Sequence, residues 1–133
     1  MREYKLQIVT PDGLKFDGVA ESLLVRTDDG DVEILANHAD LLAAIDTGRA
    51  RIIVDGEKKF ASVSGGFLSV NAGDVRLCVI TFEFADQIDL HRAEQAKARA
   101  ESALKVAKDA RDERIAKAKL ARAASRIHVG NMK

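Results

Sequence analysis

The pattern of apolar residues changes near residue 86, and this change limits what the chain can fold into. Up to residue 85, short runs alternate apolar and polar positions, as at Tyr4, Leu6 and Ile8, and clusters of Gly, Asp, Asn and Ser separate them. After residue 85 there is no Pro, and the only Gly is Gly130. A period of two is typical of strands and a period of 3.6 of helices. The sequence therefore predicts a β-domain at residues 1–85 and a helical domain at residues 86–133.

The first domain is punctuated at short, regular intervals by turn residues. The dipeptide Asp55-Gly56 separates two runs of strand-forming residues. A two-residue type I′ hairpin needs positive φ at both central positions, which Asp and Gly tolerate. A second strand pair is expected across residues 71–74, and the glycines at 65 and 66 predict a bend or a close backbone approach. Many short strands at this spacing predict a β-sandwich or flattened barrel.

The second domain has an apolar stripe that consists mostly of alanine. The stripe recurs at helical spacing in two stretches: Ala93, Ala96, Ala100, Ala103, Leu104 and Ala107, then Ala116, Leu120, Ala123, Ala124 and Ile127. We expect two antiparallel helices with a turn at residues 108–112, where Asp109 and Asp112 are candidate N-caps. Each buried alanine methyl contributes only about 0.8 kcal/mol, so such a hairpin is weakly held.

The expected turn contains no residue that forbids a continuous helix. A helix from residue 88 to residue 127 would be about 60 Å long. The helical domain is therefore predicted to have two states of similar free energy, a compact hairpin and an extended rod.

The border between the domains carries the stretch Ile88-Asp89-Leu90-His91-Arg92-Ala93. Local helix chemistry can explain it: Asp86 is a candidate N-cap, Asp89 then lies in the first turn near the positive end of the helix dipole, and Arg92 can pair with Asp89 three residues away. Taken alone, this structural interpretation is favoured over a binding site.

Charge is distributed unevenly along the chain, although the net charge is zero. Residues 1–85 carry 9 Lys/Arg and 14 Asp/Glu, whereas residues 86–133 carry 12 and 7. From Arg114 onward there are only basic charges. Such a segment is either a solvated helix face or a surface that docks on an acidic partner. Nucleic acid is disfavoured because aromatic residues are few and none follows Phe84, so base stacking has no support.

Several other functions have no sequence signal. The single cysteine, Cys78, fits a reducing compartment, and neither a signal peptide nor an apolar run long enough to span a membrane is present. There is no glycine-rich phosphate loop, no metal-ligand spacing among the three histidines, and no nucleophile constellation near Ser64. We predict no catalytic site, no metal site and no direct membrane insertion.

Four stretches together resemble the epsilon subunit of bacterial F-type ATP synthases. They are "VTPDG" at 9–13, "NHADLLAAIDTGRARI" at 37–52, "SVSGGFLSV" at 62–70 and "IDLHRA" at 88–93. The last is similar to the Ile/Leu-Asp-x-x-Arg-Ala nucleotide motif of that family. The resemblance extends over nearly the whole chain.

The resemblance implies a non-catalytic rotor subunit on the cytoplasmic face of the bacterial cell membrane. Its expected partners are the gamma subunit, the c-ring and the alpha/beta catalytic hexamer. The helices would inhibit ATP hydrolysis when extended. The resemblance implies that the inhibitory contacts to the beta subunit come from five basic residues, Arg114, Lys117, Lys119, Arg122 and Arg126. It also places His38 in a loop that contacts the stalk or c-ring.

The resemblance further implies that ATP is a regulatory ligand that stabilises the compact hairpin. The implied ATP-binding residues are Glu83, Ile88, Asp89, Arg92, Ala93, Arg99, Arg122 and Arg126. Carboxylates would accept from adenine or ribose donors, and guanidinium groups would bind phosphate oxygens in pairs. Two alternatives stay open: a purely structural stalk adaptor that binds no nucleotide, and an independent nucleotide-sensing or basic-helix binding module.

Overall fold

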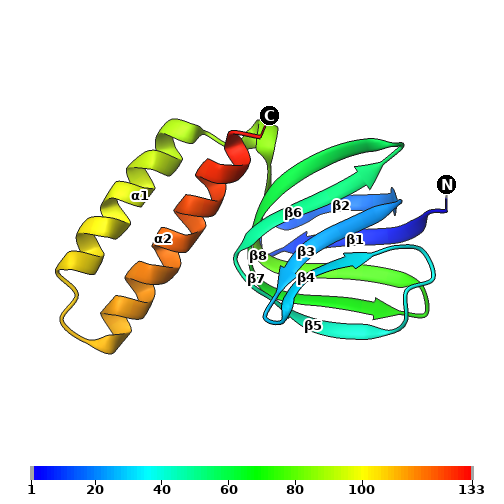
Figure 1. Cartoon of the computed structure of the whole chain (residues 1–133), viewed down its shortest axis with the longest axis horizontal. Helices are drawn as coiled ribbons and strands as arrows, with labels where there is room; N and C mark the ends of the chain where they lie inside the picture. Colours follow the sequence, from blue (N-terminus) through cyan, green and yellow to red (C-terminus); the bar gives the residue numbers. More distant parts are fainter. Residues whose placement is uncertain (1, 133) are drawn as a thin grey trace.

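The computed structural model describes residues 2–132 and places a β-domain beside an antiparallel helical hairpin (Figure 1). The strands are β1 (Tyr4–Thr10), β2 (Gly13–Ala20), β3 (Ser22–Thr27), β4 (Gly30–Ile34), β5 (Leu41–Ile45), β6 (Gly48–Val54), β7 (Glu57–Asn71) and β8 (Asp74–Phe84). A short 3-10 turn, η1 (Ala85–Gln87), leads to helices α1 (Leu90–Lys105) and α2 (Ala110–Gly130). The predicted fold, a β-sandwich followed by two helices, is confirmed.

The strands form one continuous, curved sheet in the order β2-β1-β8-β7-β5-β3-β4, and β6 pairs with both β3 and β7. The long strand β7 pairs with β6 along its first half and with β5 along its second half. All pairs are antiparallel except β1 with β8, which run parallel from Leu6–Val75 to Val9–Cys78. The sheet thus folds over on itself and encloses one core.

The core follows from the period of two in the strands. Tyr4, Leu6 and Ile8 all point inward, as their spacing predicts, and Leu6 and Ile8 are completely buried. The Tyr4 hydroxyl donates to the carbonyl oxygen of Ile34 at 2.7 Å. Burial, with the Glu33 carboxylate as the second cause, raises the pKa of the Tyr4 phenol well above its usual value, so the hydroxyl keeps its proton and remains a donor.

The two predicted hairpins and the glycine bend are confirmed. Asp55 and Gly56 have φ values of 53° and 76°, as a type I′ turn requires. Residues 71–74 join β7 to β8. At Gly66, φ is 135° and an added Cβ would overlap the carbonyl oxygen of Cys78 on β8, so only glycine allows the two backbones to approach here.

The helical hairpin turns at residues 106–109, which overlaps the predicted turn at 108–112 but starts two residues earlier, so Ala107 lies in the turn and not in the first helix. The first helix also begins differently from the prediction. Asp109 is the N-cap of α2 and accepts from the backbone N–H of Asp112 at 2.8 Å. Asp86, the expected N-cap of the first helix, instead lies in η1. Asp89 is the true N-cap of α1, because the backbone of residues 85–88 makes one tight turn before the helix starts.

Alanines form the contact between the two helices. Four of them are no more than 2% exposed: Ala93 and Ala100 of α1, and Ala116 and Ala123 of α2. Ala103 and Ala124, also part of the predicted stripe, are exposed. Four buried methyl groups contribute roughly 3 kcal/mol, so the seam alone holds the hairpin weakly.

Candidate functional site

Helix α2 packs on the β-domain, whereas α1 packs on α2, on the side away from the β-domain (Figure 1). The C-terminal end of α2 is fixed by a small apolar cluster of Ala85, Ile88 and Val129, with Phe60 and Leu90 against it. Gly130, the last residue of α2, packs against the start of α1, where an added Cβ would come within 2.6 Å of the Leu90 side chain. The hairpin is therefore anchored at its base, near the border between the domains.

Two polar contacts extend this anchorage along the face of α2. The hydroxyls of Ser62 on β7 and Ser125 on α2 are hydrogen bonded at 2.8 Å. Next to them, Arg126 donates to both carboxylate oxygens of Glu83, from Nε at 2.7 Å and from Nη2 at 3.4 Å. Both side chains are about 30% exposed, at 29% and 31%, so water screens this ion pair only partly.

The substitution Glu83→Gln should weaken the docking of α2. Removing the carboxylate charge leaves the half-buried Arg126 guanidinium without its counter-ion, which costs about 1–2 kcal/mol. Amide hydrogen exchange in residues 110–130 should become about 5 to 30 times faster, as that free energy implies. Glu94→Gln, on the exposed face of α1, is the matched control. Unchanged exchange in Glu83→Gln would show that the ion pair does not stabilise docking.

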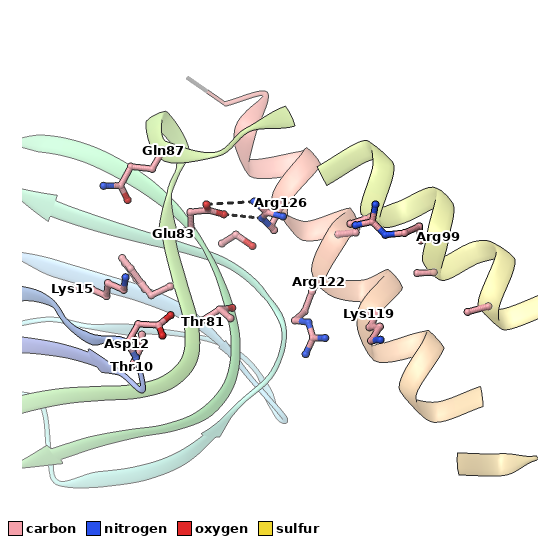
Figure 2. Close-up of a pocket in the computed structure, with 16 residues that line it drawn as sticks. Thr10, Asp12, Lys15, Thr81, Glu83, Gln87, Arg99, Lys119, Arg122 and Arg126 are labelled. Carbon is pink, nitrogen blue, oxygen red and sulfur yellow. Dashed lines mark hydrogen bonds and ion pairs between the residues drawn. The ribbon is translucent and has the colours of Figure 1, made fainter. Parts of the chain in front are cut away.

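Below this anchorage, a groove of about 900 Å³ separates the hairpin from the β-domain. Its helical wall carries Arg99 of α1 and Lys119, Arg122 and Arg126 of α2, and Figure 2 shows the sheet wall with Lys15, Asp12 and Glu83 opposite. The charged lining residues are five basic and two acidic. A concave site with an excess of positive charge attracts anions, and its guanidinium groups can bind phosphate or carboxylate oxygens in pairs.

The structure brings together half of the residues predicted to bind ATP. Glu83, Arg99, Arg122 and Arg126 line the groove. Ile88 is buried in the apolar cluster and Ala93 in the helix seam, so neither presents its side chain to the groove. Asp89 and Arg92 are exposed at the start of α1 and lie outside its lining. The ATP-binding roles of all eight residues stay predictions.

The expected side-chain pair between Asp89 and Arg92 does not form. Asp89 Oδ1 instead accepts from the backbone N–H of Arg92 at 3.1 Å, because an N-cap carboxylate satisfies the free donors of the first helical turn. The Arg92 guanidinium makes no ion pair with any of residues 2–132. It is therefore available to a ligand or a partner.

The five basic residues predicted to meet the beta subunit divide into two groups. Arg114 and Lys117 face solvent, and Lys117 pairs with Glu113 at 2.7 Å. The hydrogen bond from Lys117, followed by its charge, lowers the pKa of Glu113. Lys119, Arg122 and Arg126 face the groove instead. In this compact form, three of the five are turned toward the chain's own β-domain.

His38 lies in the loop between β4 and β5, where it is half-buried and its Nδ1 is 2.7 Å from the carbonyl oxygen of Ala39. Its contact with the stalk or c-ring stays a prediction. Within residues 2–132 no group of His, Cys, Asp and Glu side chains could hold a metal ion. Neither helix of the described chain is long and apolar enough to cross a membrane.

Sequence reasoning found only Glu83 on the sheet side of the groove and missed the other polar residues there. Asp12 and Lys15 come from the β1–β2 turn and from β2, and Thr81 comes from β8. No local pattern marks these residues, because they reach the groove only through the parallel pairing of β1 with β8 and the docking of α2.

The two domains of the fold each match a family of known proteins. The family model of the ATP synthase delta/epsilon chain β-sandwich domain matches residues 3–85, and that of the long α-helix domain of the same family matches residues 86–131. The chain therefore belongs to the ATP synthase delta/epsilon chain family.

Individual relatives narrow this class to epsilon chains. The chain is 40% identical over 129 residues to the ATP synthase epsilon chain of Bacillus velezensis, with 97% of this chain and 98% of the relative covered. It is 38% identical over 135 residues to that of Ruminococcus albus, with both chains covered in full. The resemblance to epsilon subunits is confirmed, and with it the expectation of a non-catalytic central-stalk subunit.

Solved structures agree on the fold. A chain of the Euglena gracilis mitochondrial ATP synthase, in a structure of its OSCP, F1 and c-ring, superimposes with a TM-score of 0.75 at 21% identity over 87% of this chain and 74% of that chain. A chain of the Tetrahymena thermophila central stalk and c-ring gives 0.66 at 16% identity over 96% and 93%.

Proposed function

We propose that this chain couples the gamma subunit to the c-ring and restrains ATP hydrolysis through its C-terminal helices. The compact hairpin is the form that does not inhibit, and ATP bound in the groove stabilises it. The subunit acts at the cytoplasmic face of the bacterial cell membrane, as a peripheral part of the synthase, and contacts the alpha/beta hexamer when the helices extend. One observation carries the proposal: four basic side chains of a weakly sealed hairpin converge on one groove.

The energetics support a reversible hairpin. Its seam is made of alanine methyls, and its docking depends on one small apolar cluster, one hydroxyl pair and one ion pair. A ligand that binds only the compact form shifts the balance toward that form by about 2.7 kcal/mol at a concentration of 100 Kd. A shift of that size is comparable with the roughly 3 kcal/mol of the alanine seam.

The groove also explains how ATP would compete with inhibition. In the compact form Lys119, Arg122 and Arg126 face the groove, so they are not available to the beta subunit. An extended hairpin would remove them from the sheet wall and expose them. A polyanion that neutralises these charges therefore opposes extension.

The alternative is a stalk adaptor that binds no nucleotide. It is favoured by one specific observation: Asp89 is already engaged as the N-cap of α1, a role that needs no ligand. Under this alternative the border motif starts a helix, and partner contacts alone decide between compact and extended forms.

Calorimetric titration of the full chain with ATP distinguishes the two. We expect saturable binding that Arg99→Ala weakens about tenfold, because one charge-assisted contact to phosphate is lost. Lys97→Ala, two residues away on the exposed face of α1, is the control and should bind as the unmodified chain does. Absence of binding at millimolar ATP would contradict nucleotide sensing and favour the adaptor.

A further inference from the structure

The helical hairpin is closed by its own chain at one end and open at the other. The turn at residues 106–109 joins α1 to α2, and the last turn of α2 lies at the opposite end, beside η1 and the start of α1 (Figure 1). The turn keeps the helices together at the closed end whatever happens to their contacts. An extended form therefore requires that the end of α2 leave the start of α1, so the contacts at the open end control extension.

One side chain of α2 joins all the parts that meet at the open end. Val129 is completely buried and packs with Ala85 of η1 and with Ile88, which is 3% exposed. Phe60 of β7 and Leu90 of α1 pack against the same cluster. The ion pair and the hydroxyl pair described above connect α2 to the sheet alone. The Val129 cluster differs from them because it also connects α2 to α1.

Gly130 completes the close contact between the two helix ends. It is the last residue of α2 and is not among the glycines with positive φ, so its backbone conformation does not require glycine. An added Cβ would lie 2.6 Å from Leu90 Cδ2 and 3.1 Å from Ile88 Cγ2. Glycine is also a poor helix former. Gly130 therefore weakens the end of α2 as a helix but allows it to pack directly on Ile88 and Leu90.

The closed end of the hairpin is less well sealed. Val106, in the turn, is 71% exposed, and Ile115, in the second turn of α2, is 44% exposed. Burial of apolar surface is the main favourable term in such contacts, so these two side chains contribute little to holding the helices together. Apolar contacts beyond the alanine seam are therefore concentrated at the open end.

We propose that the last turn of α2 is a latch: residues 129–130 are held by Ile88 and Leu90, and the hairpin extends only after this contact opens. The border stretch at residues 88–93 then has a role that needs no ligand. Asp89 starts α1, and the apolar residues on either side of it hold the end of α2. The effect of the latch on ATP hydrolysis rests on the proposed function, whereas the latch itself does not.

Hydrogen exchange in the full chain, measured for Val129→Ala, tests the latch. The substitution leaves a cavity in the cluster, so the compact form is destabilised. Amide exchange in residues 93–126 should become about tenfold faster, because opening of the latch exposes both helices along their length. The β-domain amides should keep their protection. Val106→Ala is the matched control: it makes the same change in an exposed side chain at the closed end, and exchange should stay within about twofold of its value in the unmodified chain.

Gly130→Leu tests the latch by adding volume instead of removing it. Leucine favours helix more than glycine does, so α2 alone would become more stable. The added side chain has no space against Leu90, however, and overpacking should make exchange in residues 93–126 about tenfold faster. Leu90→Ala in the same chain returns space and should restore exchange to within about threefold of the unmodified chain. His128→Leu, exposed near the same end of α2, is the control and should change exchange by less than about twofold.

Two results would overturn the latch. If Val129→Ala and Gly130→Leu speed exchange only in residues 127–132, the end of α2 frays locally and does not control extension. If Val106→Ala has the same effect as Val129→Ala, the closed end holds the hairpin as firmly as the open end. ATP hydrolysis by the synthase assembled with Val129→Ala tests the proposed function separately and should fall severalfold. The expected exchange with unchanged hydrolysis would leave the latch in place and show that the extended helices do not inhibit.

Discussion

A chain that ends after Asp86 is expected to assemble into the synthase and to raise its rate of ATP hydrolysis severalfold. The β-domain has its own core, centred on residues such as Leu6, Leu68 and Leu77, to which the helices contribute nothing. It should therefore fold without the hairpin and keep its contacts in the rotor. The proposed inhibitory contacts, from Arg114 to Arg126, are all removed. Steady-state hydrolysis by the complex, before and after the exchange of subunits, measures the effect.

The control for this truncation keeps both helices and removes only two of their basic charges. A chain with Arg114→Gln and Lys117→Gln retains the groove residues and the docked hairpin, because both side chains face solvent. It should raise the rate of ATP hydrolysis by the complex, but less than the truncation does. Equal hydrolysis by the truncated and full-length complexes, with the truncated chain shown to be present, would contradict inhibition by the helices.

Ala123→Glu should open the hairpin. Ala123 is 2% exposed and lies in the seam between α1 and α2, at the edge of the groove, so the seam has no space for the longer glutamate side chain. Forcing a larger side chain into a packed contact typically costs about 1–3 kcal/mol, which is comparable with what the whole seam contributes. We expect hydrogen exchange to become fast throughout residues 90–130, while the β-domain amides remain protected.

The neighbouring residue provides the matched control for this substitution. Ala124 has the same size, lies on the same turn and is exposed, so Ala124→Glu introduces the same charge without burying it. It should leave exchange in α1 and α2 nearly unchanged. If the two variants behave alike, the alanine seam does not hold the hairpin, and its compact form depends on the contacts at Glu83, Ser62 and Val129.

Most of the fold could be predicted because local chemistry determines it. The change from a period of two to a period of 3.6, the positive φ required at residues 55 and 56, and the capping side chain of Asp109 each act within a few residues. The start of α1 was predicted wrongly for a related reason. Asp86 and Asp89 are both good N-caps, and the choice between them depends on burial of Ala85 and Ile88 against Val129, more than 40 residues away.

The candidate site could be predicted on its helical side and at Glu83, but not on the rest of its sheet wall. Arg99, Arg122 and Arg126 lie at helical spacing in a hairpin, so their convergence follows from the hairpin itself. Lys15 and Asp12 reach the groove through the sheet order, which no local pattern encodes. The pairing of Glu83 with Arg126 also depends on how α2 docks, so sequence reasoning treated both as free ligands.

The parallel pairing of β1 with β8 has a mechanical consequence. The strand β8 leads through η1 into the hairpin and lies between β1 and β7. Nearly the whole length of β8 is paired with β7. Hydrogen bonds of a sheet lie across the strands. A pull on the helices along β8 therefore loads all of these bonds in shear at once and cannot unzip them one by one. A rotating machine that drags on the hairpin would bend or undock the helices well before it tore their anchor strand out of the sandwich.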